Sequence, residues 1–261
     1  MKVLMVIIMI VIPLLCGCNT PDIPKDNHDQ SIIVDHFIHA IFTKCPKEVA
    51  EQAQGISTEV KRGASKRLWD LYGKLTYTER HDCIQALWIL NNDDSNETLA
   101  SILKIERDPE LTCNAVNILI ERGKDEAYDY YIRALSVKTT KSNYENKMAW
   151  LSCLSWLLQE GHIFNKKLIP VIIGNITADS KASVYFASQC ATMMQSITNT
   201  LPDNINETID QEYELQESPQ KIKEVHDKWA RWWEENKDTF KYQYQPWPKE
   251  QGGIAMPSPA Q

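Results

Sequence analysis

The chain has 261 residues, of which 43% are hydrophobic and 24% are charged. This is enough apolar material to bury one large core or two smaller ones, so disorder throughout the chain is excluded. Lys and Arg number 28 against 35 Asp and Glu, a formal net charge of −7, and the basic residues form no long cluster. The balance argues against nucleic acid as a partner, because binding of phosphate needs concentrated positive charge.

The first residues have the pattern of a secretory signal. Lys2 is followed by an uninterrupted apolar run, Val3–Leu15, which is shorter than the roughly 20 residues of a membrane span but suits the apolar centre of a signal peptide. The next motif, LCGC at 15–18, resembles the bacterial lipobox, in which a cysteine after a small residue is lipidated and becomes the mature N-terminus. The resemblance implies that residues 1–17 are a signal peptide and that Cys18 carries the lipid.

A lipobox also implies how the mature protein is held in the cell. Lipobox cysteines carry two or more acyl chains such as palmitate, and two chains anchor stably where one is marginal. Asn19 replaces the Asp that tends to retain enterobacterial lipoproteins at the inner membrane, so an outer-membrane, periplasm-facing position is favoured. On this interpretation Cys16 leaves with the signal and Cys18 is neither a redox group nor a metal ligand. The alternatives are an uncleaved N-terminal anchor, against which Pro13 argues, and a plain signal cut elsewhere.

Polar segments flank the predicted folded part. Residues 18–30 contain two prolines and no periodicity, which predicts a flexible tether above the bilayer. Residues 242–261 contain four prolines and two glycines, which predicts a Pro-rich tail. The folded domain is therefore expected over 31–241.

Between these segments the sequence predicts an all-α fold, because no stretch shows the sustained alternation of a strand. Thr76 with Glu79 and Ser142 with Glu145 have capping-box spacing. Asp108 precedes Pro109, as at a helix start, and Gly123 marks a helix end. The helices are expected at Thr58–Leu75, Glu79–Leu90, Glu97–Arg107, Pro109–Arg122, Asp125–Val137, Tyr144–Gln159, Lys166–Asn175 and Lys181–Thr198.

These helices fall into antiparallel pairs with short connections, as in an α-solenoid. Leu99–Leu135 resembles a HEAT repeat: an apolar helix, an Asp-Pro turn, a second helix that interleaves small and large apolar residues, and a Gly-containing turn. Leu168–Met194 is a second match, with Pro170 in its first helix. Thr112 stands where the family usually has Arg, and the acidic stretch 202–217 interrupts the array. The resemblance implies a HEAT-like solenoid that binds proteins through its exposed surface.

The last predicted helix, 218–242, has one apolar face and one charged face. Its apolar face comprises Ile222, Val225, Trp229, Trp232, Asn236 and Phe240. This pattern predicts a helix that closes the array, and the alternative makes Trp233 and its neighbours a docking patch. The segment Lys147–Gln159 is apolar on nearly every face, so Trp150 and Trp156 are expected in the core.

Four cysteines, Cys83, Cys113, Cys153 and Cys190, each fall in the second helix of a predicted pair. Spaced one per pair, they are not expected to converge on a metal ion. We expect them to be free, buried and packed as small apolar side chains. At least one disulfide is the alternative, because the protein is expected to be exported, and Cys45 makes the mature non-lipid count odd.

No sequence motif identifies a catalytic centre. The tetrapeptide 80–83, RHDC, has triad residue types, but successive helical residues point about 100° apart. His36 and His39 can share a helix face without a third ligand beside them. The sequence thus favours a lipid-anchored, non-catalytic protein-interaction scaffold of the cell envelope, without cofactor or metal. The alternatives are an all-α envelope enzyme such as a cell-wall hydrolase, and a small-ligand or metal-binding lipoprotein.

Overall fold

The computed structural model describes residues 27–159, 164–198 and 219–242. The expected signal peptide, Cys18, the tether up to residue 26, the acidic stretch 202–217 and the tail from residue 243 lie outside the described residues. The described part is all-helical, with eleven α-helices, 79% of its residues in helix and no strand. The prediction that the fold is all-α is thereby confirmed. None of the described helices combines the length and the apolar character that a crossing of the bilayer requires.

The helices follow one another with short connections. Their bounds are α2 (Asn27–Thr43), α3 (Pro46–Gln54), α4 (Thr58–Tyr72), α5 (Tyr77–Leu90), α6 (Asp93–Ile105), α7 (Pro109–Glu121), the 3₁₀ turn η2 (Asp125–Ala127), α8 (Tyr128–Ser136), α9 (Tyr144–Gln159), α10 (Leu168–Gly174), α11 (Lys181–Thr198) and α12 (Pro219–Asn236).

Several helix ends are set by the caps that the sequence predicts. Thr76 accepts a hydrogen bond from the Glu79 amide, and Glu79 accepts one from the Thr76 amide, which completes the capping box of α5. The Asp108 carboxylate accepts from the first amides of α7, and Pro109 occupies the first helical position. Gly123 follows α7 with φ 72°, a conformation that glycine adopts without steric cost.

Other boundaries differ from the predictions. α6 begins four residues before the expected Glu97, because Asn92 and Ser95 exchange side-chain and backbone hydrogen bonds and cap the helix earlier. Ser142 is not the cap of α9: the helix begins at Tyr144, and the Ser142 hydroxyl lies 3.0 Å from that of Thr140. α2 begins at Asn27, so helix already occupies the last four residues of the predicted tether.

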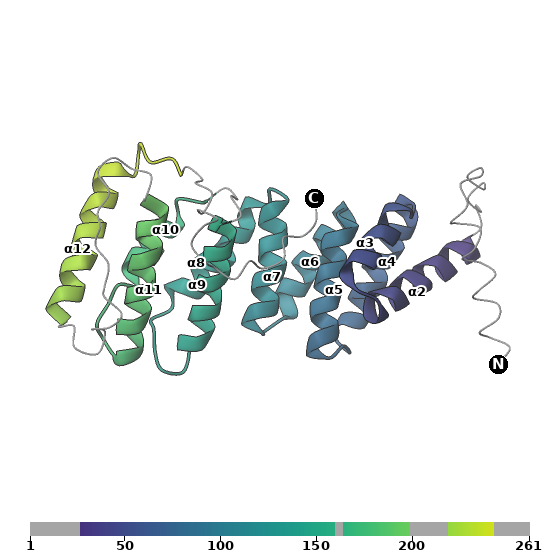
Figure 1. Ribbon diagram of the computed structural model, residues 1–261, viewed down its shortest axis with the longest axis horizontal. Coiled ribbons are helices and arrows are strands. Elements are labelled where there is room, and N and C mark those ends of the chain that lie inside the picture. Colours follow the sequence, from purple (N-terminus) through teal and green to yellow (C-terminus); the bar gives the residue numbers. More distant parts are fainter. Residues whose placement is uncertain (1–26, 160–163, 199–218, 243–261) are drawn as a thin grey trace.

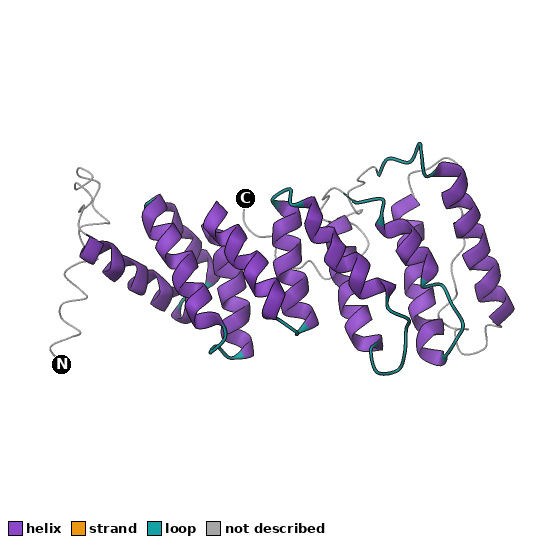
Figure 2. Cartoon of the chain, turned by 180° about the vertical axis from the view of Figure 1, so that it is seen from behind, coloured by secondary structure: helices purple, strands orange, loops and turns teal. Residues whose placement is uncertain are grey.

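The helices lie side by side along the long axis of the molecule (Figures 1 and 2). Contacts between helices two positions apart define two layers. In the second layer α3 contacts α5, α5 contacts α7, α7 contacts α9, and α9 contacts α11. In the first layer α2 contacts α4 and α4 contacts α6; the row resumes with α8 on α10 and α10 on α12. The first layer is therefore interrupted between α6 and α8. The contact between α7 and α9 in the second layer joins the two parts of the molecule, α2–α7 and α8–α12.

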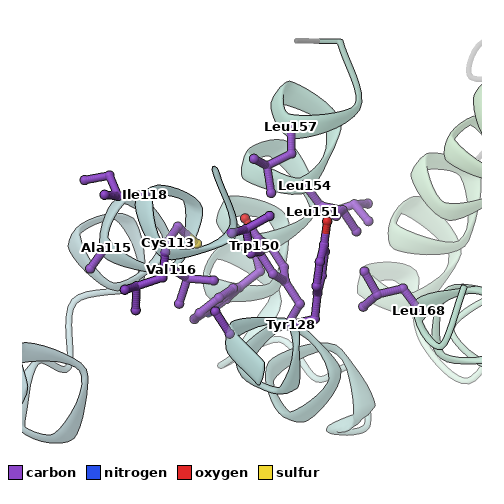
Figure 3. Packing of buried hydrophobic residues seen from close by; sticks show 14 of the residues in the cluster. Cys113, Ala115, Val116, Ile118, Tyr128, Trp150, Leu151, Leu154, Leu157 and Leu168 are labelled. Carbon is purple, nitrogen blue, oxygen red and sulfur yellow. The ribbon is translucent and has the colours of Figure 1, made fainter. Parts of the chain in front are cut away.

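The core lies between the layers and runs from α2 to α12. Side chains of α7, α8 and α9, including Val116, Tyr128 and Trp150, fill the space between these helices (Figure 3). Trp150 is buried as predicted, whereas Trp156 is only partly buried. The predicted inward face of α12 is confirmed for all members except Asn236, which is half-buried.

Candidate interaction site

An open groove of about 380 Å³ lies on the second layer, near the carboxyl ends of α3, α5 and α7. Its lining residues are Ala50, Ala53, Gln54, Lys61, Trp88, Ile89, Asn91, Glu121 and Arg122. Asn91 reaches the groove because it ends α5 in the left-handed conformation, with φ 43°, and so turns the chain toward α6. Asn tolerates this conformation better than most residues.

Trp88 and Glu121 form the wall between α5 and α7. The Trp88 indole N–H donates a hydrogen bond of 3.0 Å to Glu121 Oε2. Both side chains are half-buried, so the ring and the carboxylate stay accessible from the groove. The bond fixes the orientation of the indole and joins two neighbouring helices of the second layer.

Arg122 holds the same two helices together through hydrogen bonds to the end of α5. Its Nη2 donates to the carbonyl oxygens of Leu87 and Trp88, both at 2.8 Å, and its Nη1 donates to Ser95 Oγ at 3.0 Å and Asn96 Oδ1 at 2.5 Å. The guanidinium thus binds carbonyl groups of the last turn of α5, of which that of Leu87 also accepts a hydrogen bond from the Asn91 amide. Burial lowers the pKa of Arg122 without threatening its charge. Because Arg122 is held by these four acceptors, the groove is preformed.

The chemistry of the groove suits an extended peptide. Ala50, Ala53 and Ile89 supply apolar surface beside the Trp88 ring, and the amides of Gln54 and Asn91 can hydrogen-bond a peptide backbone. Glu121 is the one carboxylate among the lining residues. The groove therefore does not provide the pair of carboxyl groups by which most glycoside hydrolases act.

A second polar cluster lies around Glu106, at the end of α6. Its carboxylate is almost fully buried and accepts hydrogen bonds from the Tyr72 hydroxyl at 2.6 Å and from Arg80 Nη1 at 2.7 Å. The amides of Arg107 and Asp108 also donate to it. Burial opposes ionisation, but these donors and the charge of Arg80 outweigh it and hold the pKa of Glu106 below its usual value. Both carboxylate oxygens of Glu106 are thus engaged, and the cluster joins α4, α5 and α6.

A third cluster surrounds Lys147 on α9. Its ammonium group is buried and donates to the Val137 carbonyl at 2.5 Å, to Thr139 Oγ1 at 2.9 Å and to Asn175 Oδ1. It also lies 4.7 Å from the centre of the Phe186 ring. No carboxylate among the described residues forms an ion pair with it, and burial lowers the pKa of Lys147 to about 8. All three ammonium donors are used, so the lysine ties α8, α9 and α10 together.

Four of the cysteines lie on α5, α7, α9 and α11, one on each helix. Cys83, Cys113 and Cys190 are buried and Cys153 is half-buried, all as free thiols, in keeping with their predicted role as packed side chains. Cys113 lies on α7 and Cys153 on α9, and these two helices are neighbours in the second layer.

The remaining predicted residues take no part in a site. His36 and His39 are exposed on α2, and no group of three or more metal-ligating side chains occurs among the described residues. In the tetrapeptide 80–83, Arg80 turns to Glu106 whereas Cys83 is fully buried, so the four side chains do not converge. Sequence reasoning missed the Trp88 groove and the Glu106 and Lys147 clusters; the only local signal was Arg122 beside the helix-ending Gly123.

No protein-family model, curated protein or solved structure matches the chain. Functional interpretation consequently depends on the geometry of this chain and on its sequence motifs.

Proposed function

We propose that the protein is a lipid-anchored scaffold of the bacterial cell envelope that binds a protein partner through a HEAT-like helical array. The array is an α-solenoid of antiparallel helix pairs, closed by the Trp-rich helix α12. The groove of α3, α5 and α7 is its partner site, and the partner contributes an extended, largely apolar peptide segment.

The order of helix contacts supports the solenoid. Each helix of the second layer contacts the next helix of that layer, and within the pairs α2 contacts α3, α4 contacts α5, and α10 contacts α11. Such nearest-neighbour packing is the defining feature of repeat arrays. α12 packs its apolar face on α10 and α11 and leaves Lys223, Glu224 and Arg231 exposed, as a closing helix with a polar outer face should.

The groove supports the choice of partner. It combines the half-buried Trp88, an aromatic residue of the type that carries binding energy at interfaces, with preformed polar groups around it. A preformed site loses little conformational entropy on binding. An extended segment uses both the apolar and the polar groups of the groove. Its side chains alternate between the apolar floor and solvent, while its backbone hydrogen-bonds to Gln54 and Asn91.

The anchor is supported by the N-terminal sequence alone. Lys2, the apolar run and the LCGC motif at 15–18 stand in the order of a lipoprotein signal. Lipid on Cys18 holds the array at a membrane, and Asn19 favours the outer membrane, on its periplasmic side.

The experiment is in-cell crosslinking and affinity capture of the full-length protein, followed by identification of what is recovered. The unchanged protein is compared with Ala50→Glu, which places a charge and added bulk on the groove floor, and with Trp88→Ala. Trp69→Ala is the matched control, because Trp69 is an exposed tryptophan on α4 outside the groove. We expect one envelope protein to be recovered with the unchanged and Trp69→Ala proteins and to be lost from both groove variants, while cooperative melting shows that each variant is folded.

Recovery of that protein with Ala50→Glu would contradict the groove assignment. The anchor is tested separately by fractionation and by mass spectrometry of the mature N-terminus. A diacylated Cys18 in the membrane fraction, and release of the Cys18→Ala form from it, are expected; an N-terminus at another residue would overturn the lipobox interpretation.

A further inference from the structure

We propose that the chain's own segment 243–261 binds in the groove of α3, α5 and α7 and competes there with the partner's peptide. The inference rests on the proposed function of the groove as a peptide site and adds its regulation, because a partner then binds only by displacing this segment.

The segment starts on the array and not beyond α12. After α12 the chain runs along the upper edge of the molecule as drawn in Figure 1, back toward α9. Tyr242, the last described residue, donates a hydrogen bond of 3.2 Å to the carbonyl oxygen of Leu158, near the carboxyl end of α9. Its ring centre lies 5.5 Å from that of Phe164. Residues 243–261 therefore continue from the second layer, at the carboxyl end of α9.

The groove lies at the same edge of the molecule. Short connections reverse the chain between α7 and α8 and again between α8 and α9, so α7 and α9 run in the same direction. Tyr131 of α8 shows which parts of them are level: its hydroxyl donates to Asn117 Oδ1 of α7 at 2.5 Å, and its ring centre lies 5.0 Å from that of Trp150 of α9. Glu121 in the groove and Leu158 beside Tyr242 both lie on the carboxyl side of this level.

The spacing of the helices decides which part of the segment reaches the groove. Packed helices lie about 8–10 Å apart, so α5, two positions from α9 in the second layer, is roughly 20 Å away from it. Five residues of extended chain span at most about 17 Å, so Trp247 falls short of α5. Ile254 and Met256 are more than twice as far along the chain from Tyr242 and reach the groove without full extension.

The composition of the segment matches the lining of the groove. Residues 251–260 carry no charged side chain, and so bury no charge against the apolar floor. Ile254 and Met256 are two positions apart, which places both side chains on one side of an extended chain. Two prolines follow them within the next three residues, and proline-rich segments dock in grooves lined by aromatic rings such as that of Trp88. Attachment to the array raises the effective concentration of the segment, so modest contacts are enough.

The test uses the purified full-length protein in detergent with a photocrosslinking amino acid at position 254. After irradiation, tryptic peptides are analysed by mass spectrometry. The α3 side of the groove lies in peptide 48–61 and the α5 side in peptide 81–104. We expect crosslinks from position 254 to both peptides, in a yield that does not depend on protein concentration because the link forms within one chain. The same amino acid at position 247 is the matched control and should not reach peptide 48–61.

The groove variants show whether these crosslinks report binding in the groove. Ala50→Glu should abolish them, whereas Trp69→Ala, outside the groove, should leave them unchanged. Crosslinks to other peptides alone, an equal yield with Ala50→Glu, or crosslinks that form only between two molecules would overturn the proposal.

Competition is measured by in-cell capture with the double variant Ile254→Asp, Met256→Asp, which leaves every lining residue of the groove in place. It should recover several-fold more partner than the unchanged protein, and equal recovery would contradict the competition. The two proposals fail separately. Crosslinks in the groove without any captured partner would contradict the proposed function alone. A partner that is lost with Ala50→Glu, together with no crosslink from position 254 to the groove, would contradict this inference alone.

Discussion

The two parts of the array, α2–α7 and α8–α12, each bury one charged side chain, and they compensate it differently. In the first part Glu106 is paired with the guanidinium of Arg80 and with three further hydrogen-bond donors. In the second part Lys147 donates only to neutral oxygens, those of Val137, Thr139 and Asn175. Both groups connect three helices at the same kind of position, near the ends of neighbouring helices.

The ionisation of the two groups shows what the difference means. The pKa of Glu106 is lowered despite burial, because an opposite charge and four donors favour the carboxylate. The pKa of Lys147 falls to about 8, because the three dipoles do not offset desolvation of the ammonium. A full counter-charge therefore offsets the effect of burial on the pKa, whereas neutral dipoles alone leave the pKa of the ammonium lowered.

The largest loss of stability is expected from a substitution in α12, the last helix of the second part. Trp229→Ala removes a fully buried indole of α12 that packs in a T-shaped contact on Trp232. The cavity and lost apolar burial should cost about 3–5 kcal/mol of unfolding free energy. Denaturant unfolding measures it, with Arg231→Ala, an exposed change on the same helix, as control. A loss below about 1 kcal/mol would show that α12 contributes little to the array.

Glu106→Gln tests directly how the first part of the molecule compensates its buried charge. Glu106→Gln keeps the shape but removes the charge and leaves Arg80 partly buried without its partner, at a cost of about 3 kcal/mol. Glu110→Gln is the matched control: Glu110 also accepts a tyrosine hydroxyl, from Tyr77 at 2.7 Å, but it is exposed. Because the folded pKa of Glu106 lies below the unfolded value, its contribution is present above the unfolded pKa and is lost as pH falls through the folded pKa. As pH is lowered, the unfolding free energy of Glu106→Gln should thus fall less steeply than that of the unchanged protein. Equal slopes for the two proteins would contradict the lowered pKa of Glu106.

Sequence patterns predicted the helices well where local chemistry determines them. The Thr76 capping box, the Asp108–Pro109 start and the apolar spacing of α12 involve residues within one or two turns of each other, and each was confirmed. Spacing within a single helix shows which face is apolar, so the burial of Trp229 and Trp232 followed directly.

The groove and the two buried charges could not be predicted in the same way. Trp88 meets Glu121 across 33 positions, and Lys147 meets Asn175 across 28. Such contacts depend on how the helices lie in the array, which no local pattern encodes. Lys147 is also the first residue of a segment that is otherwise apolar. At such a position a lysine is expected to lie in solvent at the end of a hydrophobic helix.

The pH dependence of Lys147 sharpens the comparison. The folded pKa of about 8 lies below the ordinary lysine value of 10.5, so between these values the unfolded chain binds more protons and stability rises with pH. The gain is at most about 3 kcal/mol, from 1.36 kcal/mol per pKa unit. Lys147→Met should lack this gain in unfolding free energy. From pH 8 upward, the unfolding free energy of the unchanged protein should therefore rise relative to that of the variant. Lys138→Met, at an exposed lysine paired with Asp179, is the control and should show no such shift; a pH-independent difference for Lys147→Met would mean that the three acceptors do compensate the buried charge.

The smallest effect distinguishes the helix starts of the two parts. Thr76→Ala removes the cap of α5, in which the Thr76 side chain accepts from the Glu79 amide, and should cost about 1 kcal/mol. Ser142→Ala should cost almost nothing, although its spacing to Glu145 resembles that of Thr76 to Glu79, because α9 begins only at Tyr144 and the Ser142 hydroxyl contacts Thr140 instead. Thermal unfolding of the two variants side by side measures the difference. Equal losses would place the start of α9 at Ser142, as its sequence suggests, and would make the two helix starts alike.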